Sequence, residues 1–510
     1  MGPAHRDVYR EQEVLGSPGL FRIFYLCRDM TAALIIYLIL LVFIALRSAR
    51  KVKDVPDFFV ARKGASARMV AGSLVATILG GSAVIGAIDS GAKLGGAASW
   101  FMLVGALGLL ALIPFAARAY KHGKYALPDL VENLYGKGPR LVATIVIPIA
   151  WTGIVAAQII AAAKLLMTFT PMEYTTAAVV AAAVFTGYTL AGGQLSILRT
   201  DFLQACLIIA GLLLIAGFAL FNGAGDVASA TSNATNSAAG IAGILQGAPA
   251  FPFNANFTPL DLFLLILTYG TTYTAGPDIF SRVFCAKDTA TAKKGIAMAA
   301  ATLIPVAFII GFLAVFGTSL GEVQGARITS IAGSVLPAPL IPLVALALLS
   351  VVLSSADTTL LSSSVILCGL LRIGADPKGA RDTQNAAARN PQTDGRPLLK
   401  ARIVILVNGI VALLLALVFT DIIGTLLLAL AVYAGAFTVP ILWGLAGLRS
   451  KPASVAAGII LGGALALAGK LCPPLPGAIG SHTGDVLTIA AFIVNGICLA
   501  IGRIRPTGSP

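Results

Sequence analysis

Long apolar segments recur along almost the whole chain and are separated by short polar or charged stretches. An apolar segment of about 18 residues or more is long enough to cross a bilayer as a helix. The breaks in the pattern predict thirteen such spans, at 31–47, 67–91, 96–117, 140–168, 173–191, 202–222, 257–281, 294–318, 340–371, 402–420, 423–447, 453–471 and 485–503. We therefore expect one polytopic, all-α integral membrane domain over 31–503, with an extramembrane segment at 1–30 and a tail at 504–510.

The composition supports the same class of protein. Of 510 residues, 57% are hydrophobic and only 11% are charged, whereas charged residues make up about 25% of a soluble domain. The six cysteines lack the paired spacings of a metal site or a disulfide framework. His5, His122 and His482 lie outside the spans, so a membrane-embedded enzyme would lack its nucleophile or metal set. The short tail argues against a sensor with a soluble output domain.

Lysine and arginine are distributed unevenly between the loops. They cluster after the first, third and ninth spans, whereas 222–255 carries neither. Positively charged loops stay in the cytoplasm, which predicts an external N-terminus and a cytoplasmic C-terminus after Arg503 and Arg505. The net charge of +14 is therefore largely a topology signal, and we do not expect nucleic-acid binding.

Two spans are interrupted near their middle. The second carries small residues at 80–82, and the seventh carries Gly276 next to Pro277. Close helix packing through small residues would explain either interruption alone. If the second span is core helix one, the seventh is core helix six, so the interruptions begin two successive sets of five helices. Because each set has an odd number of spans, the two sets are inverted relative to each other in the membrane. Paired interruptions of inverted repeats indicate a transporter site, because unwound backbone at that depth must line a cavity.

The ninth span, core helix eight, contains "VVLSSADTTLLSSS", which has seven hydroxyls and a carboxylate. Helical spacing places Ser354, Asp357 and Thr358 on one side and apolar residues on the other. A bond to the preceding turn would explain any single hydroxyl. It does not explain Asp357, since a carboxylate at mid-membrane costs about 2.5–3.5 kcal/mol. Hard cations prefer oxygen ligands, so we predict a monovalent cation site between this face and the interrupted helix.

Five segments occur in a particular order: "DFFVARKGASARMVAGSLVAT", "YALPDLVENLYG", "GGQLSILRTDFLQ", "GPDIFSRVFCAKDTATAKKG" and "LLSVVLSSADTTLLSSSVIL". The order and spacing of these segments over about 31–447 resemble those of the sodium:solute symporter family. The resemblance implies a leucine-transporter-type 5+5 inverted repeat over about 67–447, with core helices one and six broken. It also implies Na⁺-coupled symport of a small organic solute into the cell by alternating access, in the plasma or inner membrane.

The resemblance also implies a main sodium site. Its ligands would be the carbonyls of Ala76 and Leu79 in core helix one, the carbonyl of Val351 in core helix eight, and the hydroxyls of Ser354 and Ser355.

Some family members hold a second sodium ion, for which the matching positions are Asp201, Ser354, Asp357 and Thr358. Asp201 has another interpretation, because "TDFLQ" reads as a helix N-cap with Gln204 at the third helical position. A proton-coupled symporter is the alternative function, since Asp357 and Asp201 could both titrate.

The resemblance places the solute beside the interruptions. The matching positions are Ile78, Gly81, Ser82, Ala83, Gln158, Tyr269, Thr272, Tyr273 and Tyr433. Ala83 stands where sugar carriers have a glutamine, and core helix three lacks the arginine of sialate carriers. These departures argue against a sugar or sialate and favour a small amino acid, a vitamin-like acid or a carboxylate.

Overall fold

The computed structural model describes parts of 33–50 and residues 55–170, 172–230, 251–321, 326–371, 396–471 and 482–504. The predicted segment at 1–30 and almost all of the tail lie outside the described residues. The described part is helical, with isolated bridges but no β-strand. The predicted all-α class is therefore confirmed for this part of the chain.

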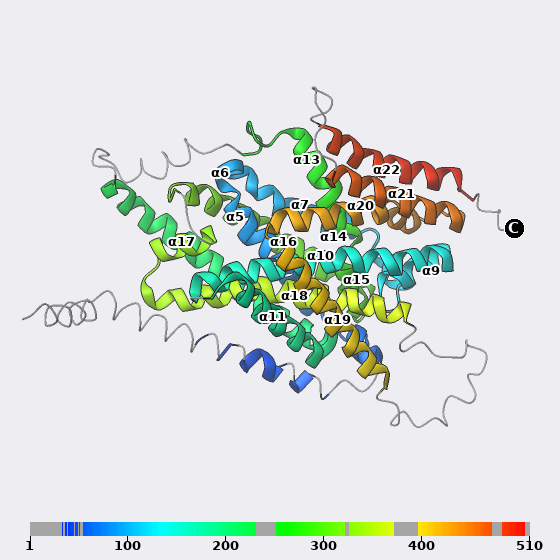
Figure 1. Ribbon diagram of the computed structural model, residues 1–510, viewed down its shortest axis with the longest axis horizontal. Coiled ribbons are helices and arrows are strands. Elements are labelled where there is room, and N and C mark those ends of the chain that lie inside the picture. The colour runs from blue at the N-terminus through cyan, green and yellow to red at the C-terminus, as the bar shows by residue number, and fades with distance from the viewer. Residues whose placement is uncertain are drawn as a thin grey trace, which may run out of the picture.

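The helices run in the following order: α3 (Val55–Val60), η1 (Ala61–Lys63), α4 (Ala67–Ile78), η2 (Ser82–Gly86), α5 (Ala87–Asp89), α6 (Gly91–Leu94), η3 (Gly95–Ser99), α7 (Trp100–Leu112), α8 (Ala116–His122), α9 (Leu127–Tyr135), α10 (Lys137–Phe169), α11 (Tyr174–Ala230), α13 (Pro259–Leu265), η4 (Ile266–Gly270), α14 (Thr271–Ala275), α15 (Pro277–Cys285), α16 (Thr289–Thr318), α17 (Arg327–Val335), η5 (Ala338–Leu340), α18 (Ile341–Leu370), α19 (Arg396–Val418), α20 (Ile422–Leu445), α21 (Pro452–Leu471) and α22 (Thr483–Ile501). Figure 1 shows them as one bundle, with α21 and α22 side by side at its edge. Within the described residues, nine helices are long and apolar enough to cross a membrane, or ten if one bent pair counts as a span.

Both predicted interruptions are present. α4 ends at Ile78, and the chain resumes at Ser82 in a direction bent by 54°. In the seventh predicted span, α14 ends before Gly276, whose backbone is extended, and α15 begins at Pro277. The count of thirteen spans and the inverted repeat stay predictions.

The predicted loop between the fifth and sixth spans is helical instead. α11 runs through this segment and is kinked at Gly193, where φ is +59°. A Cβ there would lie 2.6 Å from a ring carbon of Phe58, so only glycine allows this approach. Asp201 lies inside the helix that continues beyond the kink. The interpretation of Asp201 as an N-cap is therefore wrong.

α18 lies at the centre of the bundle. It packs against α10 and α11, and α4 packs against α11 and α16. Every side chain from 350 to 366 is buried, including the hydroxyls and Asp357. Large apolar side chains such as Ile149, Val418 and Ile493 are exposed at the surface of the bundle, as expected for a surface that faces lipid. This arrangement places the polar groups in the protein interior, where they find partners or line a cavity.

Candidate functional site

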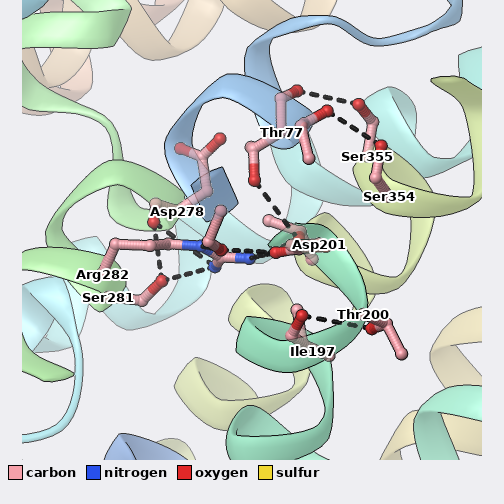
Figure 2. A network of polar contacts seen from close by, with 12 residues as sticks. Thr77, Ile197, Thr200, Asp201, Asp278, Ser281, Arg282, Ser354 and Ser355 are labelled. Atoms are coloured by element: carbon pink, nitrogen blue, oxygen red, sulfur yellow. Dashed lines mark hydrogen bonds and ion pairs between the residues drawn. The ribbon is translucent and has the colours of Figure 1, made fainter. Parts of the chain in front are cut away.

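The hydroxyls of α18 contact the last carbonyls of α4. Ser354 Oγ donates to the Ala76 carbonyl at 2.8 Å and lies 3.3 Å from the Val351 carbonyl. Ser355 Oγ donates to the Thr77 carbonyl at 2.8 Å. Figure 2 shows both serines pointing at the end of α4. Three of the five predicted sodium ligands, those at Ala76, Val351 and Ser354, are thus brought together.

These carbonyls are available because α4 stops. In a continuous helix, the Thr77 carbonyl would accept from the N–H of Gly81. Here Gly81 N–H donates to Gln158 Oε1 at 3.0 Å instead. A Cβ on Gly80 would lie 2.5 Å from Ser355 Oγ, so α18 could not approach this closely if residue 80 had a side chain. The interruption therefore frees backbone oxygens and lets the serines reach them.

Thr77 was missed by the sequence prediction, which named the carbonyls of Ala76 and Leu79 in this segment. Leu79 is fully buried, and its N–H bonds the Val75 carbonyl at 2.9 Å. A signal for Thr77 was present, since it lies in the last turn of a helix, where carbonyls lack intrahelical partners.

The position predicted for a second sodium ion contains a guanidinium. Arg282 of α15 is fully buried, and its Nη2 lies 3.3 Å from Asp201 Oδ2. The same nitrogen donates to the Thr358 hydroxyl, and Nε donates to Ser73 Oγ at 3.0 Å. Ser73 in turn donates to the Asp201 carboxylate. Asp201 and Thr358 are therefore brought together, but around a cation that the protein itself supplies. Figure 2 shows this guanidinium beside Asp201.

Arg282 was not recognised from the sequence. The predicted span ended at residue 281, so the arginine fell just outside it. Its spacing of four residues from Asp278 was the available signal, because it places both side chains on one face of a helix.

Asp357, the other carboxylate of the predicted second site, is also fully buried. Neither of its carboxylate oxygens accepts a hydrogen bond from the described residues. It lies within electrostatic range of both Asp201 and Arg282. The buried group thus combines two carboxylates with one guanidinium.

A cavity of about 30 Å³, enough for about one water molecule, lies beside the interruption in α4. It is lined by Thr77, Ile78, Gly80, Ser82, Trp151, Ile154, Gln158, Thr272, Tyr273, Asp278, Ser355, Thr359, Leu426 and Leu430. Five predicted solute contacts are among them: Ile78, Ser82, Gln158, Thr272 and Tyr273. Because Thr77 and Ser355 also line it, the cavity adjoins the carbonyl and hydroxyl oxygens described above.

The other predicted solute contacts lie behind or beside this lining. Tyr269 packs edge-on against Tyr273, with ring centroids 5.0 Å apart. Tyr433 packs edge-on against Trp151, with centroids 4.5 Å apart, and its hydroxyl donates to the last carbonyl of α14 at 2.5 Å. Ala83 is buried and does not line the cavity. Gly81 does not line the cavity either, but its N–H donates to Gln158, which does.

Sequence reasoning missed three other notable lining residues, Trp151, Ile154 and Asp278. Trp151 and Ile154 precede Gln158 by seven and four residues, so helical spacing alone places all three on one face of α10. Asp278 is the first charged residue after the interruption at Gly276. Its carboxylate was an available signal.

Comparison with known families matches residues 58–462, most of the chain, to the sodium:solute symporter family. The chain belongs to that family. Because this family and the relatives below are transporters, the predictions of a membrane transport protein and of no enzymatic activity are confirmed.

Two curated relatives are similar over part of this symporter-family chain. The sodium/proline symporter of Haemophilus influenzae is 27% identical over 242 residues, which cover 45% of this chain and 44% of the relative. The high-affinity proline transporter PutP of Bacillus subtilis is 33% identical over 105 residues, 20% of this chain and 22% of the relative. The chain thus matches less than half the length of either relative.

Solved structures resemble the fold over most of its length. A Na⁺-coupled sialic acid symporter, substrate-bound and outward-open, is 18% identical with a TM-score of 0.70, over 94% of this chain and 99% of the other. The nucleobase-cation-symport-1 transporter Mhp1 is 15% identical with a TM-score of 0.53, over 87% and 94%. Both have the leucine-transporter fold, so this family member shares that fold.

Proposed function

We propose that this protein is a secondary transporter that couples the inward movement of sodium to the uptake of a small organic solute. The contact of Ser354 Oγ with the Ala76 carbonyl, at the end of α4, is the observation that carries the proposal. It joins hydroxyl and carbonyl oxygens, the ligands that hard cations prefer. The next residues along the two helices, Thr77 and Ser355, line the cavity.

The proposed sodium ligands are the carbonyls of Ala76, Leu79 and Val351 and the hydroxyls of Ser354 and Ser355. Each serine now donates its proton to a carbonyl of α4. A hydroxyl hydrogen rotates freely, so an incoming ion would turn it away and be bound by the same oxygens. Ion binding would then replace direct contacts between α4 and α18 with shared coordination.

A single sodium ion per cycle is part of the proposal. Asp201 and Thr358 already bind Arg282. A sodium ion among these groups would lie beside a guanidinium, and like charges in a low-dielectric interior repel strongly. Arg282 would thus supply the positive charge at the second position.

Coupling requires that sodium bind one conformation better than the other, because equal affinity shifts no equilibrium. The end of α4 could provide this difference in affinity. Its carbonyl oxygens and the hydroxyls of α18 form one set of ligands only in the conformation in which the two helices are in contact. Sodium would hold that contact and order the adjacent cavity, and release of sodium in the cytoplasm would loosen both. The small cavity implies that its walls move apart when a solute enters.

The membrane orientation that we propose has the N-terminus outside and the C-terminus in the cytoplasm, as the loop charges predict. A fluorescent reporter that folds only in the cytoplasm, fused to the C-terminus, should fluoresce.

Uptake into proteoliposomes tests the coupling ion. We expect solute accumulation with an inward sodium gradient and none with an equal potassium gradient at constant pH. Accumulation driven by a proton gradient without sodium would support the alternative, a proton-coupled symporter that uses Asp357 or Asp201, and would overturn the proposal.

A further inference from the structure

We infer that the solute carries a positively charged amino group, which the Asp278 carboxylate binds inside the cavity. This inference rests on the proposed function, because it names the class of solute that the same cavity takes. The solute would be a primary or secondary amine, either a cation or a zwitterion.

Asp278 is buried to more than nine-tenths, with 8% of its surface exposed, and it lines the cavity. Its Oδ1 has no hydrogen-bond partner among the described residues. Figure 2 shows the carboxylate turned away from the Arg282 guanidinium. An unpaired carboxylate in a protein interior is strongly unfavourable, so a cation that enters the cavity would gain the missing interaction.

Arg282 forms its ion pair with another residue and not with this carboxylate. It lies four residues further along α15, but its Nη1 is 3.5 Å from the main-chain carbonyl of Asp278 and 2.7 Å from Ser281 Oγ. Its ion pair is formed with Asp201. The Asp278 carboxylate is therefore left without a direct cationic partner among the described residues.

The position of Asp278 in the helix favours a negative charge on its side chain. It is the second residue of α15, after Pro277, where the free N–H groups of the first turn stabilise an anion. That interaction alone would make Asp278 a structural residue. It does not account for a carboxylate oxygen left without a partner at the wall of a cavity.

The other lining residues fit the same class of solute. Among the described residues that line the cavity, Asp278 alone carries a charge, so an anionic solute would meet no positive side chain there. Trp151 and Tyr273 add aromatic rings, whose faces attract cations. The indole N–H of Trp151 has no acceptor among the described residues and is available to an oxygen of the solute.

The test uses the full-length protein in detergent and three pairs of probes in which oxygen replaces nitrogen: alanine and lactate, proline and tetrahydro-2-furoate, and pyrrolidine and tetrahydrofuran. Melting temperature is measured in sodium chloride and in potassium chloride. A ligand that binds only the folded state raises the melting temperature. We expect at least one amine to raise it in sodium, while its oxygen counterpart leaves it unchanged. Stabilisation by the oxygen counterparts, or by none of the amines, would overturn the inference.

Asp278→Asn should abolish the response to the amine and retain the rise in melting temperature caused by sodium alone. Asp485→Asn, which removes a carboxylate at the start of α22, is the matched control and should behave as the wild type. If Asp278→Asn lost the sodium response instead, Asp278 would be a sodium ligand and the inference would be wrong. If the wild type itself did not respond to sodium, the proposed function would fail, which is a different result.

Discussion

Nη2 of Arg282 lies 3.3 Å from Oδ2 of Asp201, and neither side chain is exposed. The two residues come from α15 and α11 and are 81 positions apart. Their ion pair is held by hydroxyls on both sides, Ser73 on α4 and Thr358 on α18. One buried guanidinium therefore ties together the four helices that surround the proposed site.

Replacing either member of this pair should destabilise the protein strongly. Arg282→Gln or Asp201→Asn alone leaves a buried charge without its partner, which costs roughly 3–5 kcal/mol. The double variant Asp201→Asn with Arg282→Gln leaves neither member of this ion pair without the other and should lose less than the sum of the two. The melting temperatures of the wild type and the three variants form a double-mutant cycle, which checks this prediction. Strictly additive losses would show that the pair is not coupled.

Ser354→Ala should weaken sodium binding. It removes an oxygen that meets the Ala76 carbonyl, and one hydrogen-bonding group to a charge contributes about 1.5–3 kcal/mol. The sodium concentration for half-maximal uptake should therefore rise about tenfold or more, whereas solute affinity at saturating sodium should change much less. Ser364→Ala, further along α18, is the control and should leave the sodium dependence unaltered. An unaltered sodium dependence in Ser354→Ala would rule out the proposed ligand set.

Gly80→Ala should disturb the contact between α4 and α18. The new Cβ would lie 2.5 Å from Ser355 Oγ, closer than atoms of this kind approach. We expect a lower melting temperature and a weaker response to sodium. Gly187→Ala is the matched control, because a Cβ there would meet nothing within 4 Å. Equal effects of the two substitutions would contradict the proposed close approach.

Gln158→Leu should close the cavity or weaken solute binding. It leaves the Gly81 N–H without its acceptor, and a buried unsatisfied donor costs about 1–3 kcal/mol. Gln158→Glu keeps an acceptor oxygen at this position and, with its carboxyl group protonated as burial favours, should retain more of the melting temperature. Sodium-driven uptake by the two variants in proteoliposomes checks the consequence for transport. Equal losses in both would show that the bond to Gly81 is unimportant.

The local features of the fold could be predicted from the sequence. The length of the apolar segments predicts the spans, and the small residues at 80–82 and at Gly276 predict the interruptions. Both features depend on residues that are close together in the sequence, so a local pattern is enough to predict them. The concentration of hydroxyls in α18 was equally visible. Short or polar helices such as α9 and α17 were missed, since neither length nor apolarity marks them as spans.

The sequence by itself determined that the protein lies in a membrane, that two of its helices are interrupted, and that one helix carries a face rich in oxygen. Only the tertiary structure decided which oxygens meet: Ser355 with Thr77, Asp201 with Arg282, and Asp278 with the cavity. The physical reason is distance along the chain. A partner 81 or 278 positions away is selected by how whole helices pack, which no local pattern contains.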